Sequence, residues 1–224
     1  MTEQLDRRAD TTRLQILRAA SHQFARKPYS LVSLDDILAD AEVTKGAMYF
    51  HFRSKHALAS EIIERGAQRG RATVDEVLSR GLSGMETLID AMYLVAIEDL
   101  DDETARAGFN LLESIGRSEG LQARVAASWI DGFTVITRRA IRENDVIEGR
   151  EPADIARLLV SMYLGIRQTS DLDDPARFLG DLEMAWTMAL PGFANPERLS
   201  YLTQFIGRRT ALAIRKTTGP ADGR

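Results

Sequence analysis

The chain of 224 residues contains no cysteine, which excludes disulfide bonds, thiol nucleophiles and cysteine-ligated zinc sites. It also has no run of about eighteen apolar residues, so no segment predicts a transmembrane helix. The first ten residues, MTEQLDRRAD, lack the apolar stretch of a secretory signal. These absences predict a protein without a membrane partner that works in the reducing cytoplasm.

Proline is scarce, and none of the six prolines falls inside a segment with regular apolar spacing. Because proline interrupts helices, this distribution predicts an all-α fold. The apolar periodicity also indicates disordered ends at residues 1–8 and 217–224. The expected helices span about 10–26, 33–40, 45–52, 54–80, 84–100, 103–115, 120–144, 153–170, 175–190 and 196–216.

A large excess of one charge sign is also missing, because the formal net charge is only −4. Residues 1–55 carry nine Lys or Arg against seven Asp or Glu, whereas residues 56–224 carry twenty against twenty-six. A weakly basic beginning can still bind a phosphate backbone, since the local field matters more than the total charge.

Signatures of catalysis and of metal binding are absent as well. The three histidines, His22, His51 and His56, do not form H-E-x-x-H or an equivalent ligand spacing. The sequence contains no G-x-S-x-G motif, phosphate-binding loop or dinucleotide glycine pattern. We therefore expect no enzyme activity, no catalytic residue, no metal and no cofactor.

Two short helices separated by the three-residue turn AEV, residues 41–43, are typical of a helix-turn-helix. Ser33 is an expected N-cap of the first helix, with Asp36 as its capping-box partner. Thr44 is an expected N-cap of the second. The sequence therefore predicts a DNA-binding motif between residues 33 and 52.

The second helix of this motif has an inner and an outer face. Met48 and Phe52 are four residues apart and are expected to face the core. That spacing leaves four other side chains or positions on the outward face: Lys45, Gly46, Tyr49 and His51.

The block VTKGAMYFHFRSKHAL, residues 43–58, closely resembles the recognition helix and following helix of the TetR family of transcriptional regulators. The stretch TKGAMYFHF is most similar to the γ-butyrolactone autoregulator receptors of actinomycetes, and SWIDGFTVITRRAIREND and LEMAWTMALPGF resemble later helices of those receptors. The resemblance implies a homodimer with an N-terminal three-helix DNA-binding head at residues 1–58. It further implies an effector-binding and dimerisation bundle at 59–216, followed by the tail 217–224.

The resemblance places the helix at 45–52 in the major groove of an operator, and the residue types suit that position. Lys45 can donate to guanine or phosphate, Tyr49 and His51 can donate to phosphates, and Gly46 allows close approach. A solvated hairpin is the alternative, but a mid-helix glycine costs about 1 kcal/mol without gain there. The expected DNA-binding residues are Ser33, Thr44, Lys45, Gly46, Ala47, Tyr49, His51 and Lys55.

Trp129 belongs to an apolar stripe that is consistent with plain core, but the resemblance implies that it covers a ligand cavity. The effector is expected to be a small lipophilic molecule, either a γ-butyrolactone-like signal or a drug or metabolite linked to an efflux or catabolic operon. Flexible methionines suit an adaptable pocket. The other expected wall residues are Leu88, Met92, Val95, Phe109, Phe133, Met162 and Ile166.

Three further expectations concern the body and the turn. A stripe of four residues is either the dimer seam or internal core: Leu179, Leu182, Trp186 and Leu190.

Gly66 and Gly70 are expected to soften the helix at 54–80, so that ligand binding can spread the two heads and release a palindromic operator. Glu42 stands where family members usually carry glycine, and a turn with positive φ then costs about 1 kcal/mol.

A helical binding module without a DNA role remains the alternative from a different functional class. Substitution of Lys45 and Tyr49 separates the two hypotheses, since only a regulator loses DNA binding through these changes.

Overall fold

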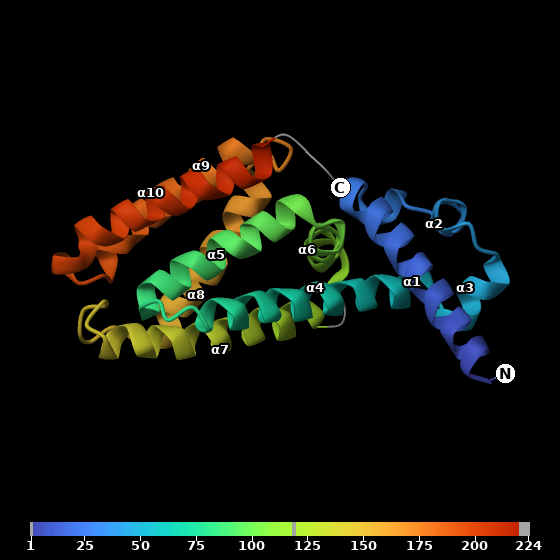
Figure 1. Ribbon diagram of the computed structural model, residues 1–224, viewed down its shortest axis with the longest axis horizontal. Coiled ribbons are helices and arrows are strands. Elements are labelled where there is room, and N and C mark those ends of the chain that lie inside the picture. Colours follow the sequence, from blue (N-terminus) through green and yellow to red (C-terminus); the bar gives the residue numbers. More distant parts are fainter. Residues whose placement is uncertain (1, 118–119, 220–224) are drawn as a thin grey trace. The chain divides into compact units, whose positions relative to one another are not determined.

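The structure, a computed structural model, describes residues 2–117 and 120–219, with side chains from residue 9 onward (Figure 1). Its described part contains no β-strand, and a single bridge joins Val146 and Ala194. The predicted all-α class is confirmed. The elements are α1 (Thr2–Arg26), η1 (Tyr29–Leu31), α2 (Leu34–Ala41), α3 (Lys45–His51), α4 (Lys55–Leu78), α5 (Gly84–Asp101), α6 (Glu103–Ile115), α7 (Leu121–Arg142), α8 (Pro152–Thr169), α9 (Pro175–Ala189), η2 (Leu190–Gly192) and α10 (Pro196–Thr218).

These helices form two compact units, neither of which is one continuous stretch. Unit 1 comprises Met1–Gly70 and Asp102–Arg124, and unit 2 comprises Arg71–Asp101 and Val125–Arg224. Helices α4 and α7 contribute residues to both units. The predicted boundary between residues 58 and 59 separates a DNA-binding part from an effector-binding part. The two compact units are defined by packing instead, so that boundary stays a prediction.

Both predicted disordered ends are partly wrong. Helix α1 begins at Thr2, because residues 2–26 consist mostly of good helix formers without glycine or proline. At the other end, Thr217 and Thr218 still belong to α10, whereas residues 220–224 lie outside the described residues. The 3-10 turn η1 was not predicted; it follows Pro28, which ends the preceding helix as expected.

The core of unit 1 lies on one side of α1, which packs against α2 and α6. Leu17, Ala20 and Phe24 are buried as the periodicity predicts. Leu14, which has the same spacing, is 55% exposed instead, and Ile16 is fully buried. The apolar stripe therefore starts at Ile16, because the inward face of α1 is set by the position of α2 and α6 rather than by hydrophobicity alone.

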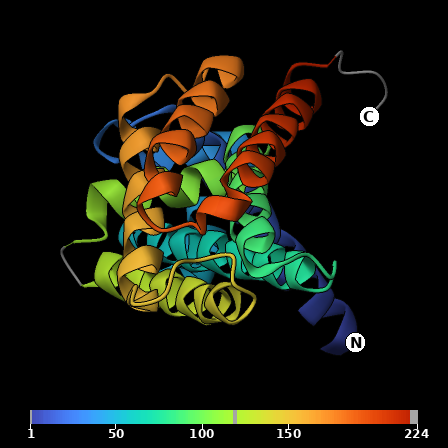
Figure 2. The ribbon, with the colours of Figure 1, turned by 90° about the vertical axis from the view of Figure 1, so that its left-hand side faces the viewer.

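The core of unit 2 is built around α5, whose eighteen residues include twelve buried ones. Helix α10 packs along α9 and α5, as Figures 1 and 2 show for the red and orange helices. The four-residue stripe on α9 and η2, from Leu179 to Leu190, is buried within one chain. It is internal core, and its interpretation as a dimer seam is wrong.

Two buried carboxylates on α5 are neutralised by arginines of the same unit. Asp90 is fully buried between Arg80, at 2.9 Å, and Arg209. Asp99 is likewise buried and pairs with Arg167 of α8 at 2.6 Å. Buried charges are tolerated only when they are paired, so these contacts specify how α5 meets its neighbours. None of the described helices is long and apolar enough to cross a membrane.

Candidate nucleic-acid interface and effector region

The turn between α2 and α3 has the geometry that usually requires glycine. Glu42 is the C-cap of α2, with φ 53° and ψ 39° in the left-handed region, and its N–H donates to the carbonyls of Leu38 and Ala39. An L-residue in this region is strained by about 1–2 kcal/mol. The expectation of positive φ at Glu42 is confirmed.

Both helices of the motif begin at the predicted caps. Ser33 Oγ accepts from Asp36 N–H at 3.0 Å, and the Asp36 carboxylate accepts from Ser33 N–H at 2.9 Å, completing a capping box. Thr44 Oγ1 accepts from Ala47 N–H at 3.2 Å. Hydrogen bonds from the Ser33 side chain and backbone lower the pKa of Asp36. Ser33 Oγ also donates to Asp36 at 2.7 Å, so a phosphate would compete with that carboxylate.

Helix α3 exposes four of its seven residues and is anchored by its inner side. Met48 is fully buried and Phe52 is 4% exposed, which confirms the predicted inner face. Tyr49 is 46% exposed. Lys45 and Gly46 are exposed, whereas Ala47 and His51 are half-buried. Of the expected DNA contacts on α3, Lys45, Gly46 and Tyr49 therefore face solvent, whereas Ala47 and His51 do so only in part.

Phe50 is the outward residue that sequence reasoning missed. Its side chain is 79% exposed, and its ring meets the ring of His51 edge-on with centroids 5.0 Å apart. The helical period that places Met48 inside also places Phe50, two residues later, on the opposite side. An exposed ring on this surface can contact a thymine methyl group.

The charge around α3 has one sign, because residues 43–60 contain three Lys or Arg and no Asp or Glu.

The Lys55 ammonium already makes hydrogen bonds within the protein. Its ammonium donates to the carbonyls of Tyr29 and Val32, each at 2.5 Å, and lies 4.1 Å from the centroid of the Tyr29 ring. Burial lowers the pKa of Lys55. An ammonium has three donors, so one N–H remains for the predicted phosphate contact.

Helix α4 is braced against α1 directly behind the motif. The Glu61 carboxylate accepts from the guanidinium of Arg13 and from Arg65 Nε, the latter at 3.0 Å. Burial raises the pKa of Glu61, but the hydrogen bonds from Arg13 and Arg65 outweigh it and the net shift is downward. Arg13 also stacks over the Phe52 ring, 5.1 Å from its centroid. This cluster fixes the end of α3 to the start of α4.

The predicted effector residues divide between the two units. Phe109 is half-buried in unit 1, and the other seven belong to unit 2. On α5, Leu88 and Met92 are buried and Val95 is half-buried. Phe133 of α7 is buried, whereas three residues are half-buried: Trp129, Met162 and Ile166. The half-buried side chains are the ones that could still meet a ligand, and their role stays a prediction.

A buried polar cluster ties together two helices that carry predicted wall residues. The Arg167 guanidinium donates to both Asp99 oxygens, at 2.6 and 3.2 Å, and Tyr163 Oη donates to Asp99 at 3.2 Å. Burial raises the pKa of the Tyr163 hydroxyl. Val95 lies one turn before Asp99 on α5. On α8, Met162 directly precedes Tyr163 and Ile166 directly precedes Arg167. The cluster therefore ties α5 to α8, and its Asp99–Arg167 pair carries no net charge.

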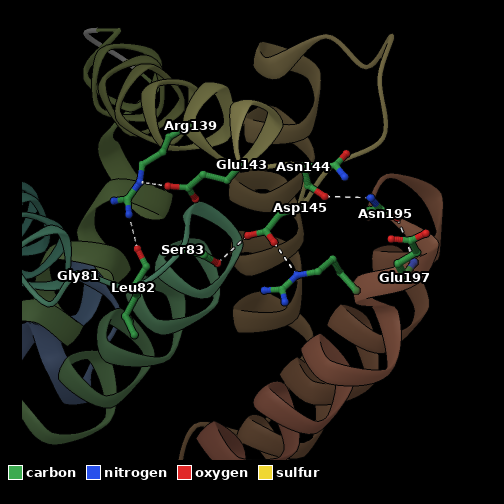
Figure 3. A pocket seen from close by; sticks show the side chains of 10 residues that line it. Gly81, Leu82, Ser83, Arg139, Glu143, Asn144, Asp145, Asn195 and Glu197 are labelled. Carbon is green, nitrogen blue, oxygen red and sulfur yellow. Dashed lines mark hydrogen bonds and ion pairs between the residues drawn. The ribbon is translucent and has the colours of Figure 1, made fainter.

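A polar pocket of about 420 Å³ lies where the α4–α5 loop, the end of α7 and the start of α10 meet (Figure 3). At its centre, buried Asp145 accepts from Ser83 Oγ at 2.6 Å and from Arg198 Nε at 2.8 Å. Glu143 accepts from Gly84 N–H at 2.6 Å. The polar groups bind one another, so the pocket joins three segments of unit 2. Within the described ranges, no cluster of three or more His, Asp or Glu could hold a metal ion.

Comparison with known proteins identifies the same motif. The sequence profile of the bacterial regulatory proteins of the tetR family matches residues 16–62, which include α2 and α3. The chain is also 28% identical over 197 residues to the A-factor receptor protein of Streptomyces griseus. That match covers 87% of this chain and 68% of the receptor.

Similar solved structures extend the likeness over the body. CprB from Streptomyces coelicolor, solved in complex with its operator sequence, superposes with a TM-score of 0.77 and 27% identity, covering 92% of this chain and 99% of CprB. A γ-butyrolactone receptor described as ArpA-like gives a TM-score of 0.74 and 26% identity, covering 92% and 98%. Residues 16–62 thus form a DNA-binding domain of the TetR family type, and the chain is similar over most of its length to γ-butyrolactone receptors of that family.

Proposed function

We propose that the protein is a homodimeric repressor that binds a palindromic operator through α3 and is released by a small lipophilic effector. The observation that carries this proposal is the exposed, cationic and aromatic face of α3 on a buried anchor. Lys45, Tyr49 and Phe50 point to solvent while Met48 is fully buried. A helix without a partner gains nothing from exposing a ring such as Phe50, whereas a groove-reading helix does. Under this proposal the protein acts in the cytoplasm as a regulator rather than as an enzyme.

Two subunits are needed because one short helix makes too few base contacts for a specific site. With the α9 stripe buried, the candidate dimer face is the opposite side of α9, where Met188 is 77% exposed and Met184 is exposed one turn earlier. Leu158 on α8 and Leu212 on α10 are also exposed apolar side chains of unit 2. Met184→Glu with Met188→Glu is expected to give monomers in analytical ultracentrifugation. A dimer of unchanged stability would place the interface elsewhere.

The effector proposed is a γ-butyrolactone-like molecule, in line with the names of two similar solved structures. The half-buried Trp129 and the neutralised Asp99–Arg167 pair favour a neutral ligand over a cationic drug. A drug or catabolic metabolite is the alternative effector. The chain has two tryptophans, so the fluorescence of Trp129 can be followed alone once Trp186 is replaced. Trp186 Nε1 is buried without a hydrogen-bond partner among the described residues. Trp186→Phe therefore removes the second fluorophore without breaking a hydrogen bond.

The experiment titrates the Trp186→Phe protein with a synthetic γ-butyrolactone and follows the Trp129 emission. Saturable quenching, with operator release over the same concentrations, supports the proposal. Trp129→Ala should then bind operator with unchanged affinity but need at least tenfold more ligand for release. If the lactone neither changes the emission nor releases DNA, the effector is a different molecule, and a metabolite and drug panel is the next test.

The switch is proposed to act through α4, which is separated from α3 by three residues and contributes to both units. Gly66 does not lie in open space: an added Cβ would be 3.4 Å from the Cα of Gly108 on α6. Gly70 has no neighbour within 4 Å of such a Cβ. We therefore assign close α4–α6 packing to Gly66 and keep the proposed soft point at Gly70 alone. If Gly70→Ala leaves ligand release unchanged, the proposed soft point at Gly70 is wrong.

A further inference from the structure

A second surface feature lies in unit 1, away from the helix-turn-helix. A groove of about 590 Å³ runs along α1 and is bordered by Arg65 of α4 and Thr104 of α6. Its volume is within the range of about 300–1,000 Å³ of small-molecule sites. Neither α2 nor α3 contributes a lining residue. No predicted effector residue lines it either, so the groove belongs neither to the α3 surface nor to the predicted effector region.

Two leucines, Leu14 and Leu17, form the apolar floor of this groove. Leu14, Leu17 and Arg18 follow one another along the α1 face, with Ser21 one turn further on. Leu17 is buried, and Leu14 is 55% exposed although it sits in the middle of a long helix. Burying an exposed leucine side chain fully is worth about 1.5–3 kcal/mol. The floor thus offers a contact surface to the apolar body of a ligand.

The charged side chains that line the groove are arginines, and Glu61 behind the groove offsets one of them, Arg65. Arg18 and Arg65 line it, and in the part of the chain that the structure describes no lining residue is acidic. Among the described residues, Arg65 donates to Glu61 through Nε, at 3.0 Å. Arg18 is exposed and makes no hydrogen bond or ion pair with the described residues. Two guanidiniums beside an apolar floor are complementary to a carboxylate carried on an acyl chain or ring.

Hydroxyl groups complete the polar side of the groove. Ser21 is 3% exposed, and Thr104 lies on the first turn of α6. A DNA phosphate could bind the two guanidiniums but would make no contact with the leucine floor. A small amphiphilic anion uses both. We propose that this groove binds an amphiphilic carboxylate, a second class of ligand that is distinct from the neutral effector of the body.

The test is isothermal titration of the full-length dimer with decanoate, with decanamide as the uncharged analogue. We expect saturable binding of decanoate and at least tenfold weaker binding of decanamide. Arg18→Ala should weaken decanoate binding at least tenfold, and Leu14→Ser severalfold. Both side chains are exposed, so the fold is preserved. Arg138→Ala, an exposed arginine of α7, and Trp129→Ala are the matched controls and should leave the affinity unchanged.

Absence of decanoate binding by the wild-type protein up to millimolar concentration would overturn the proposal. So would binding that Arg18→Ala and Leu14→Ser leave intact, or binding that is lost with Trp129→Ala. Operator affinity without decanoate is measured alongside. If Arg18→Ala lowers it tenfold while decanoate binding persists, the cations serve the DNA backbone and the carboxylate site is wrong.

Discussion

Helices α3 and α5 have the same backbone conformation but differ in burial: α3 is mostly accessible to solvent, whereas α5 is mostly buried. Helix α3 has seven residues, of which Met48 alone is buried, and α5 has eighteen residues, of which twelve are buried. Helix α3 depends on its Thr44 cap and on one inner side chain, while α5 holds even its carboxylates inside through arginines. The comparison teaches that a DNA-reading helix is kept in place by few contacts so that its side chains stay available.

The largest expected effect follows from breaking a contact of α5. Asp99→Ala leaves the buried Arg167 without its carboxylate, and removing one partner of a buried ion pair costs about 3–5 kcal/mol. Urea denaturation should show this loss. Replacing both residues by leucine should recover most of the stability, because the unpaired charge is then gone. Single and double variants of equal stability would show that the pair contributes nothing.

Breaking α3 should affect DNA affinity rather than stability. Each base or phosphate contact is worth about 1–3 kcal/mol, so Lys45→Ala with Tyr49→Ala should weaken operator binding at least a hundredfold. Because both side chains are exposed, the melting temperature should stay within a few degrees. Fluorescence anisotropy measures the affinity, and Lys216→Ala, an exposed lysine of α10, is the control. Undiminished binding would favour the helical module without a DNA role.

A smaller effect is expected where α4 meets α6. Gly66→Leu inserts a side chain against the backbone of Gly108 and should destabilise the protein by about 1–3 kcal/mol. Gly70→Leu, which enters open space on the same helix, is the matched control and should cost little. Equal stability of the two variants in thermal unfolding would show that Gly66 is not a packing glycine.

The smallest effect concerns the turn before α3. Glu42→Gly should stabilise the protein by about 1 kcal/mol, because glycine adopts positive φ without strain. Asn144 also has positive φ, 59°, but asparagine tolerates this region better, so Asn144→Gly should change stability less. Thermal unfolding of both variants gives the comparison, and a destabilised Glu42→Gly protein would contradict it.

The sequence predicts short-range features well, because they depend on neighbours along the chain. The caps Ser33 and Thr44 and the inner residues Met48 and Phe52 follow from local spacing and were confirmed. The Asp99–Arg167 pair was not predicted, since its partners are 68 residues apart. No local pattern brings such distant side chains together.

The nature of a buried face was harder to predict than its existence. The α9 stripe has the leucine spacing of either a core or a subunit interface, and only the packing of α5 and α10 decides for core. The groove along α1 was missed for a similar reason. It depends on Leu14 being outward, whereas hydrophobicity alone places that side chain inside.

The most direct test of the central claim is a DNase footprint of the purified protein on the DNA upstream of its own gene, with and without a γ-butyrolactone. The account predicts protection of a palindrome that disappears as the lactone is added. Protection that persists with the lactone and with a lipophilic extract of the producing culture would contradict release by a small lipophilic effector.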